Sequence, residues 1–163
     1  MAKIECKAGN LLINLILYPD PKSYDWVAYK IIIGPRSGNK DLSLVLSGSE
    51  LYFEACYEQE VIGLCYGIKE VLAGKVPIFF FEPVDQEDFQ FMIRKTGDDT
   101  FMISIHSDKF LIPKDYNCPA YLDKGVSVAF TKEEILSFVE QLEGEYKKVI
   151  DGYPKDPNCC RKK

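Results

Sequence analysis

Two stretches in the middle of the chain alternate between large apolar residues and a second, mostly polar set. The apolar positions are Phe89, Phe91 and Ile93 in the first stretch and Phe101, Ile103 and Ile105 in the second. A period of two is typical of half-buried β-strands. Both apolar sets are odd-numbered, so matching their faces requires a connection with an odd number of residues. Gly97-Asp98-Asp99 therefore predicts a three-residue hairpin loop, with Ile93 opposite Ile103 and Phe91 opposite Ile105.

The first third of the chain adds further runs of β-favouring residues. Residues 10–18 (NLLINLILY) and 26–34 (WVAYKIIIG) predict a pair of strands separated by a proline-containing loop. After a loop at 35–39, alternation predicts a third strand over 41–46. The segment 47–50 (SGSE) fits either a tight turn into a strand or a capping box that opens a helix. The alternation of Leu51, Phe53 and Ala55 favours a strand over 50–56.

From residue 58 onward the hydrophobic period changes to that of a helix, and Gly74 supplies a C-cap, which predicts a helix over 58–73. Gly63 and Gly67 lie four residues apart in it, and each costs about 1 kcal/mol of helix propensity relative to alanine. We expect close approach of this helix to the sheet to offset that cost. Residues 76–82 (VPIFFFE) are apolar on both faces, which predicts a strand interior to the sheet, with Pro77 at its start.

The last third predicts one more strand and a long helix. The strand covers 125–130 (GVSVAF), and Thr131 and Glu134 then form a T-x-x-E capping box at the start of a helix over 132–150. We expect its residues Ile135, Phe138 and Leu142 to be buried. The elements together predict an α+β fold, with an antiparallel-dominated sheet of about six strands and two main helices, 58–73 and 132–150, packed against it. A single domain over 1–152 and a flexible tail over 153–163 complete this prediction.

Composition limits the partners of the chain. Its 163 residues include 25 acidic and 20 basic side chains, which gives a net charge of -5. This charge opposes non-specific binding to nucleic acid or to an anionic membrane, and it permits attraction to a basic partner. The first apolar run, 11–18, is too short to cross a bilayer, and no secretory signal is recognisable. We therefore expect a cytoplasmic chain whose six cysteines are reduced, with the adjacent pair Cys159-Cys160 in the polar tail.

No complete catalytic constellation is recognisable in the sequence. His106 is the only histidine, and alternation places it on the face opposite the Phe-Ile core. No nucleotide-binding, zinc-binding or nucleophile-elbow motif is present, so we expect no metal and no cofactor. The alternative function is a small-ligand-binding domain or hydrolase, with a pocket under the 107–124 loop and either His106 or the 82–88 carboxylates at its mouth.

The order of elements resembles that of the bacterial WapI-type immunity proteins. The residues that carry the resemblance are Tyr24-Asp25-Trp26 before a strand-to-helix unit, Phe80-Phe81-Glu82-Pro83 followed by Phe89 and Phe91, and a terminal helix that ends near Tyr153-Pro154. It covers about residues 24–154, while the 110–124 loop and the cysteine-containing tail depart from the family pattern. The resemblance implies a non-enzymatic protein that binds and blocks a cognate secreted toxin, often a nuclease.

No individual partner-binding residue follows from the resemblance, so charge and position select the candidates. They are six acids and two aromatic residues: Glu82, Asp85, Glu87, Asp88, Asp98, Asp99, Tyr116 and Tyr121. An acidic surface suits the inhibition of a nuclease, because it imitates substrate phosphates and steers a basic partner toward the protein. We expect a monomer or weak dimer whose partner is a toxin domain encoded by a neighbouring gene.

Overall fold

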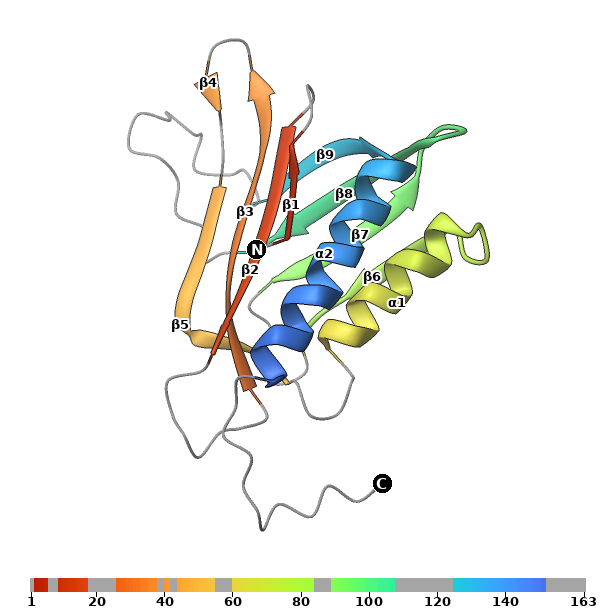
Figure 1. Ribbon diagram of the computed structural model, residues 1–163. Helices are drawn as coiled ribbons and strands as arrows, with labels where there is room; N and C mark the ends of the chain where they lie inside the picture. Colours follow the sequence, from red (N-terminus) through yellow and green to blue (C-terminus); the bar gives the residue numbers. More distant parts are fainter. Residues whose placement is uncertain are drawn as a thin grey trace.

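The computed structural model contains two antiparallel sheets and two helices (Figure 1). The structure describes residues 2–5, 9–17, 26–37, 40–41, 44–54, 60–83, 89–107 and 125–151. The α+β class, the antiparallel pairing and the two helices are confirmed. The sequence predicted one sheet of about six strands, and the structure distributes its strands over a five-stranded and a four-stranded sheet. No helix within the described ranges has both the length and the apolar character needed to cross a membrane.

The N-terminal sheet has five strands, with β1, β2, β3 and β4 in that order and β5 also paired to β3. Their bounds are β1 Ala2–Glu5, β2 Gly9–Leu17, β3 Trp26–Ser37, β4 Lys40–Asp41 and β5 Leu44–Glu54. The predicted strand pair corresponds to β2 and β3, which run antiparallel with Leu11 opposite Ile33 and Ile13 opposite Ile31. The sequence prediction missed β1, whose four residues are too few to show a period.

Two other predictions about this sheet were wrong. The predicted loop at 35–39 is partly strand, because β3 continues to Ser37 and pairs there with β4. Two separate strands were predicted over 41–46 and 50–56, but residues 44–46 and 50–54 belong to one element, β5, and Asp41 lies in β4. The turn-like residues 47–50 lie within it at an irregularity: Ala28 pairs with Tyr52, whereas Lys30 pairs with Ser47. Four residues of β5 thus oppose one of β3, so the Ser-Gly signal marks a bulge inside a strand.

The second sheet has four strands in sequence order: β6 Ile78–Phe81, β7 Gln90–Lys95, β8 Thr100–His106 and β9 Gly125–Thr131. The predicted hairpin is confirmed, since Ile93 lies opposite Ile103 and Phe91 opposite Ile105. All odd-numbered residues of β7 and β8 from 91 to 105 except Lys95 are buried, as the alternation predicted.

The prediction that residues 76–82 lie inside the sheet was wrong. Among the described strands β6 pairs only with β7, at one edge. Phe81 is buried on the inner face, whereas Phe80 is 65% exposed on the outer one. A run that is apolar on both faces is ambiguous, because it fits a doubly covered strand and equally a strand whose outer apolar face is left open.

Helix α1 spans Val61–Leu72, and its C-terminal cap agrees with the prediction. Gly74 has φ +72°, and its N–H donates to the carbonyl of Val71 at 3.0 Å. Lys75 N–H donates to the carbonyl of Glu70, also at 3.0 Å, which completes a Schellman motif.

Helix α2 spans Lys132–Asp151 and begins with the predicted capping box. The Thr131 N–H donates to Glu134 Oε2 at 2.8 Å, and the Glu134 N–H donates to Thr131 Oγ1 at 3.3 Å. Ile135, Phe138 and Leu142 are fully buried, as predicted.

The two helices lie on one side of the four-stranded sheet, and α2 also reaches the N-terminal sheet (Figure 1). Helix α1 packs on β6, β7 and α2, whereas α2 packs on α1, β1, β2 and β9. Side chains of α2 hold β1 in place: the Ala2 N–H donates to Glu145 Oε2 at 2.9 Å, and the Lys3 N–H donates to Gln141 Oε1 at 3.2 Å. The described apolar side chains from both sheets and both helices form one core.

Candidate partner-binding surface

Glu82 lies directly after β6 at the end of the second sheet, and it is exposed. The neighbouring Pro83 is buried, and Phe81 packs near Phe89 with a ring-centroid separation of 6.0 Å. These contacts fix the backbone from which Glu82 projects. The other predicted acids of this segment, Asp85, Glu87 and Asp88, lie outside the described residues, as do Tyr116 and Tyr121.

Asp98 and Asp99 lie in the hairpin loop between β7 and β8, and both are exposed. The loop is closed by the Thr96 N–H and the Gly97 N–H, which donate to the carbonyl of Thr100 at 2.9 and 3.1 Å. The carbonyl of Asp99 accepts from the Lys132 N–H at 3.3 Å, which ties the loop to the first turn of α2. The backbone of this loop is therefore held at both sides while its carboxylates face solvent.

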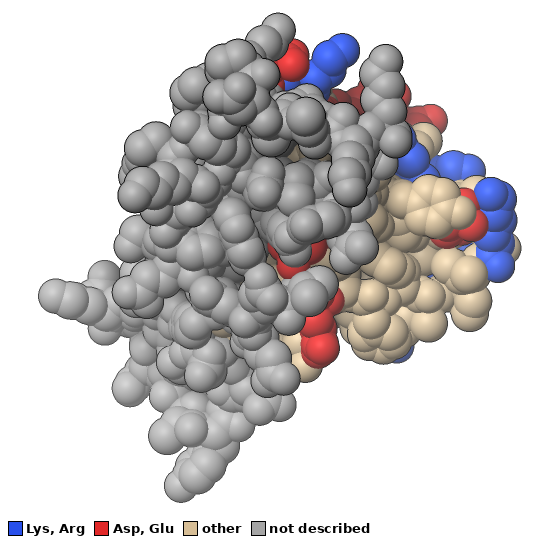
Figure 2. All heavy atoms as spheres, turned by 90° about the horizontal axis from the view of Figure 1, so that it is seen from below, with Lys and Arg blue, Asp and Glu red and all other residues tan. Residues whose placement is uncertain are grey.

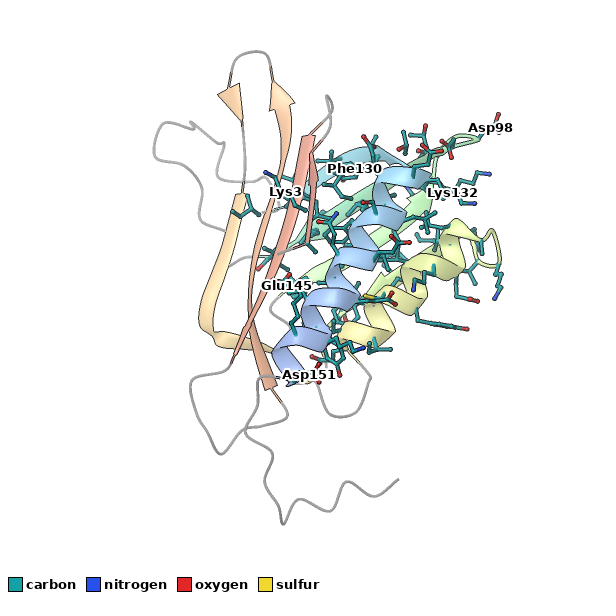
Figure 3. All side chains as sticks on the ribbon, in the orientation of Figure 1. Lys3, Asp98, Phe130, Lys132, Glu145 and Asp151 are labelled. Carbon is teal, nitrogen blue, oxygen red and sulfur yellow. The ribbon has the colours of Figure 1, made fainter. Side chains whose placement is uncertain are left out.

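The same geometry brings a further acid to the loop. Glu133, in the first turn of α2, is exposed one residue after the amide that contacts Asp99. We call Asp98, Asp99 and Glu133 the acidic corner; Figure 3 shows Asp98 and Lys132 at this end of the molecule. The sequence prediction missed Glu133 as a member. The capping box shows that α2 starts at the residue after β9, but only the pairing of β9 with β8 brings that start beside the loop.

The predicted acids do not form one continuous surface among the described residues. Glu82 follows the β6 residue paired with Phe91, near the start of β7, whereas Asp98 comes after the end of β7. The six residues of β7 separate these two levels, and an extended segment of that length spans about 20 Å. A partner domain that contacts only one end of the sheet would meet either Glu82 or the acidic corner.

His106 lies at the end of β8 on the outer face of the second sheet and is exposed, as predicted. Its ring covers Gly125, where a Cβ atom would overlap it. Ser104, on the same face, shares a hydrogen bond of 2.6 Å with Ser127 Oγ. Within the described ranges no carboxylate or nucleophile is hydrogen-bonded to His106, and the 107–124 loop proposed to cover a pocket lies almost entirely outside them.

Cys65 is the cysteine that the structure describes, and it is a free, buried thiol in α1. Burial raises its pKa to about 12, and the nearby carboxylate of Glu143 adds to the increase. Glu143 in turn forms an ion pair of 2.6 Å with Lys69, which links α1 to α2. A thiol with so high a pKa is protonated at neutral pH and is a poor nucleophile.

No group of three or more His, Cys, Asp or Glu side chains in the described part of the chain could hold a metal ion. Comparison with known proteins finds no matching family model, no matching curated protein and no matching solved structure.

Proposed function

We propose that this chain is an immunity protein that binds and neutralises a basic toxin domain encoded by a neighbouring gene. The observation that carries the proposal is the acidic corner, where a backbone held by hydrogen bonds presents Asp98, Asp99 and Glu133 to solvent. The net charge of -5 and the resemblance of residues 24–154 to WapI-type immunity proteins support the same function.

Electrostatics explains why such a corner suits an inhibitor. Carboxylates on a preorganised loop attract a basic partner over roughly one Debye length, about 8 Å at physiological ionic strength, and so raise the association rate. A nuclease binds phosphates through basic side chains, so an acidic inhibitor surface competes for the same groups. In this proposal the corner steers the encounter, and Glu82, at the far end of the sheet, is a second acidic candidate together with Asp85, Glu87 and Asp88, which follow it in the sequence.

The first experiment tests whether the partner exists. The product of the adjacent open reading frame is expressed with this chain, and co-purification followed by loss of toxin activity is expected. A neighbouring product that neither binds the wild-type chain nor is inhibited by it would refute the proposed function.

A pair of charge-reversal variants then tests the acidic corner. Asp98→Lys and Asp151→Lys change the net charge equally, but Asp151 is exposed at the opposite end of α2, about 30 Å along the helix axis (Figure 3). Stopped-flow measurements at low salt should show slower association and a weaker salt dependence for Asp98→Lys than for Asp151→Lys. Equal rates for both variants would remove the corner from the interface while leaving the immunity function standing.

The second group of acidic candidates is tested separately from the acidic corner. Reversal of Asp85, Glu87 and Asp88 together is compared with reversal of Asp98, Asp99 and Glu133 together, because the two triple variants change the net charge equally. The group whose reversal slows association more is the group that the toxin domain approaches first.

A further inference from the structure

The exposed large hydrophobic side chains of the described residues gather around one strand edge. They are Phe80 on β6, Val76 just before β6 and Tyr66 on α1, with exposed fractions of 65%, 37% and 63%. In Figure 2 the described atoms on the side where Figure 1 places α1 and β6 are mostly uncharged, with charged side chains at the margin. An apolar surface with a charged rim is typical of a protein interaction site.

The hydrogen-bond ladder shows which backbone groups this edge presents. The Thr96 N–H bonds across to Thr100, and Lys132 bonds across to Asp99. Even-numbered residues of β8 therefore bond toward β7, and odd-numbered ones toward β9. Because even-numbered residues of β7 bond toward β8, its odd-numbered residues bond toward β6. The odd-numbered residues of β6 lie opposite them, so the backbone groups of Phe79 and Phe81 point toward β7.

It follows that the N–H and C=O groups of Ile78 and Phe80 point away from the sheet. Among the described strands none pairs with this side of β6. At the β1 edge of the other sheet, a side chain bonds to the backbone: Gln141 of α2 donates to the carbonyl of Lys3 and accepts from its N–H. An open, apolar edge is a template for pairing with another strand.

We propose that β6 pairs antiparallel with β6 of a second copy of this chain, forming a symmetric dimer with one sheet continuous across both copies. Inner and outer faces must match, so residues of equal parity lie opposite each other. The register that fits best places Phe80 opposite Phe80 of the second copy. Ile78 then lies opposite Glu82 of the second copy, so that each pair brings edge-facing backbone groups together.

Charge complementarity selects this register and this occupant. Arg94 is exposed on β7 directly opposite Ile78. In the dimer Ile78 separates Arg94 from Glu82 of the second copy, which places the two charged residues two strand spacings apart, about 9.6 Å between backbones. Long side chains of opposite charge reach across that distance, and symmetry repeats the pair. The pairing thus brings Arg94 of each copy near Glu82 of the other copy.

The proline residues on either side of β6 limit the length of this ladder. Pro77 precedes the strand and Pro83 follows it closely, so the paired region is short. A two-fold axis also closes the assembly, because the pairing of β6 with β6 uses this edge of both copies. The expected product is a weak dimer without larger oligomers, and it does not depend on the proposed function.

Variants of Phe80 test the axis directly. Because the Phe80 side chain is exposed, we expect these variants to keep the fold, which circular dichroism checks. Sedimentation equilibrium of the wild-type chain should show a monomer–dimer equilibrium at concentrations up to about 1 mM. Phe80→Lys and Phe80→Glu should each be monomeric, because equal charges then face each other across the axis. An equimolar mixture of the two should dimerise again. Ser137→Lys and Ser137→Glu, at an exposed position of α2, carry the same charges and should dimerise like the wild type.

The backbone contribution is tested by Phe80→Pro, which removes an edge-facing donor and no hydrogen bond to β7. This variant should be folded and monomeric. A wild-type chain that stays monomeric at every concentration would overturn the proposal, and so would a dimer that persists in Phe80→Lys. Failure of the Lys and Glu variants to associate when mixed would overturn the placement of Phe80 on the axis.

Discussion

Gly63 and Gly67 are spaced by one helical turn in α1, yet their surroundings differ. A Cβ atom on Gly67 would overlap the ring of Phe79 on β6, whereas nothing lies within 4 Å of the Cβ position of Gly63. The expected close approach to the sheet is therefore confirmed for Gly67 and wrong for Gly63. Sequence spacing could not separate the two, because it does not show where β6 crosses the helix.

This difference predicts that substitution by alanine changes the free energy of unfolding in opposite directions at the two positions. Gly67→Ala should lower the free energy of unfolding by about 1–3 kcal/mol, because the Phe79 ring must move out of its packed position. Gly63→Ala should raise it by about 0.5–1 kcal/mol through helix propensity alone. Urea denaturation of both variants checks this, and a stabilised Gly67→Ala would show that the helix does not lie close against Phe79.

Cys65 provides a pH-dependent prediction at the same scale. An ordinary thiol has a pKa of 9.0, whereas the pKa of Cys65 is about 12 in the folded chain. The folded state therefore holds the thiol proton more tightly than the unfolded state does. The stability associated with the neutral thiol is fully present below pH 9.0 and is lost as the pH rises toward about 12. Within that window each pH unit lowers the free energy of unfolding by about 1.4 kcal/mol. The difference between the wild type and Cys65→Ala in unfolding experiments should show this slope, and parallel curves would contradict it.

At the scale of elements, the capping box at the start of α2 is the feature that could be predicted most completely from the sequence. Its two residues lie only three positions apart in the chain, so the reciprocal bonds between Thr131 and Glu134 depend on local geometry alone. The bulge in β5 is the opposite case. Ser47 and Gly48 indicate a break in regular structure, but pairing with β3 on both sides of the irregularity keeps these residues within one strand.

Removal of the cap measures how much it stabilises α2. Thr131→Ala should lower the free energy of unfolding by about 0.5–2 kcal/mol, because the Glu134 N–H loses its acceptor. Thr131→Ser keeps the hydroxyl and should lie close to the wild type. If thermal or denaturant unfolding placed the Ser and Ala variants together, the hydrogen bond would not be the source of the effect.

At the scale of the whole molecule, the class of fold followed from the sequence but the division into two sheets did not. Hydrophobic period identifies strands and helices one at a time, whereas the sheet to which a strand belongs depends on pairing between distant residues. The same limit applies to the candidate site. Asp98 and Asp99 were predicted together because they are adjacent, while their proximity to Glu133 depends on β9 pairing with β8.

Gly9 lies where the two sheets meet. It is buried at the start of β2, and a Cβ atom there would be 2.5 Å from the carbonyl oxygen of Gly34 and 2.5 Å from Val128 Cγ1 on β9. One obstacle is the side chain of the other sheet, and the second is backbone of the neighbouring strand. Only a residue without a Cβ atom allows β2 and β9 to pack this closely.

This contact predicts how firmly the two sheets are joined. Gly9→Ala should lower the free energy of unfolding by about 1–3 kcal/mol, as expected for overpacking at a buried position. Val128→Ala removes one of the two obstacles, so in a double-mutant cycle it should recover part of the loss. Recovery should stay incomplete because the Gly34 carbonyl cannot move without disturbing its pairing with β2. Additive effects of the two substitutions would instead mean that β9 does not pack against Gly9, and that α2 and the contact between β3 and β9 join the sheets.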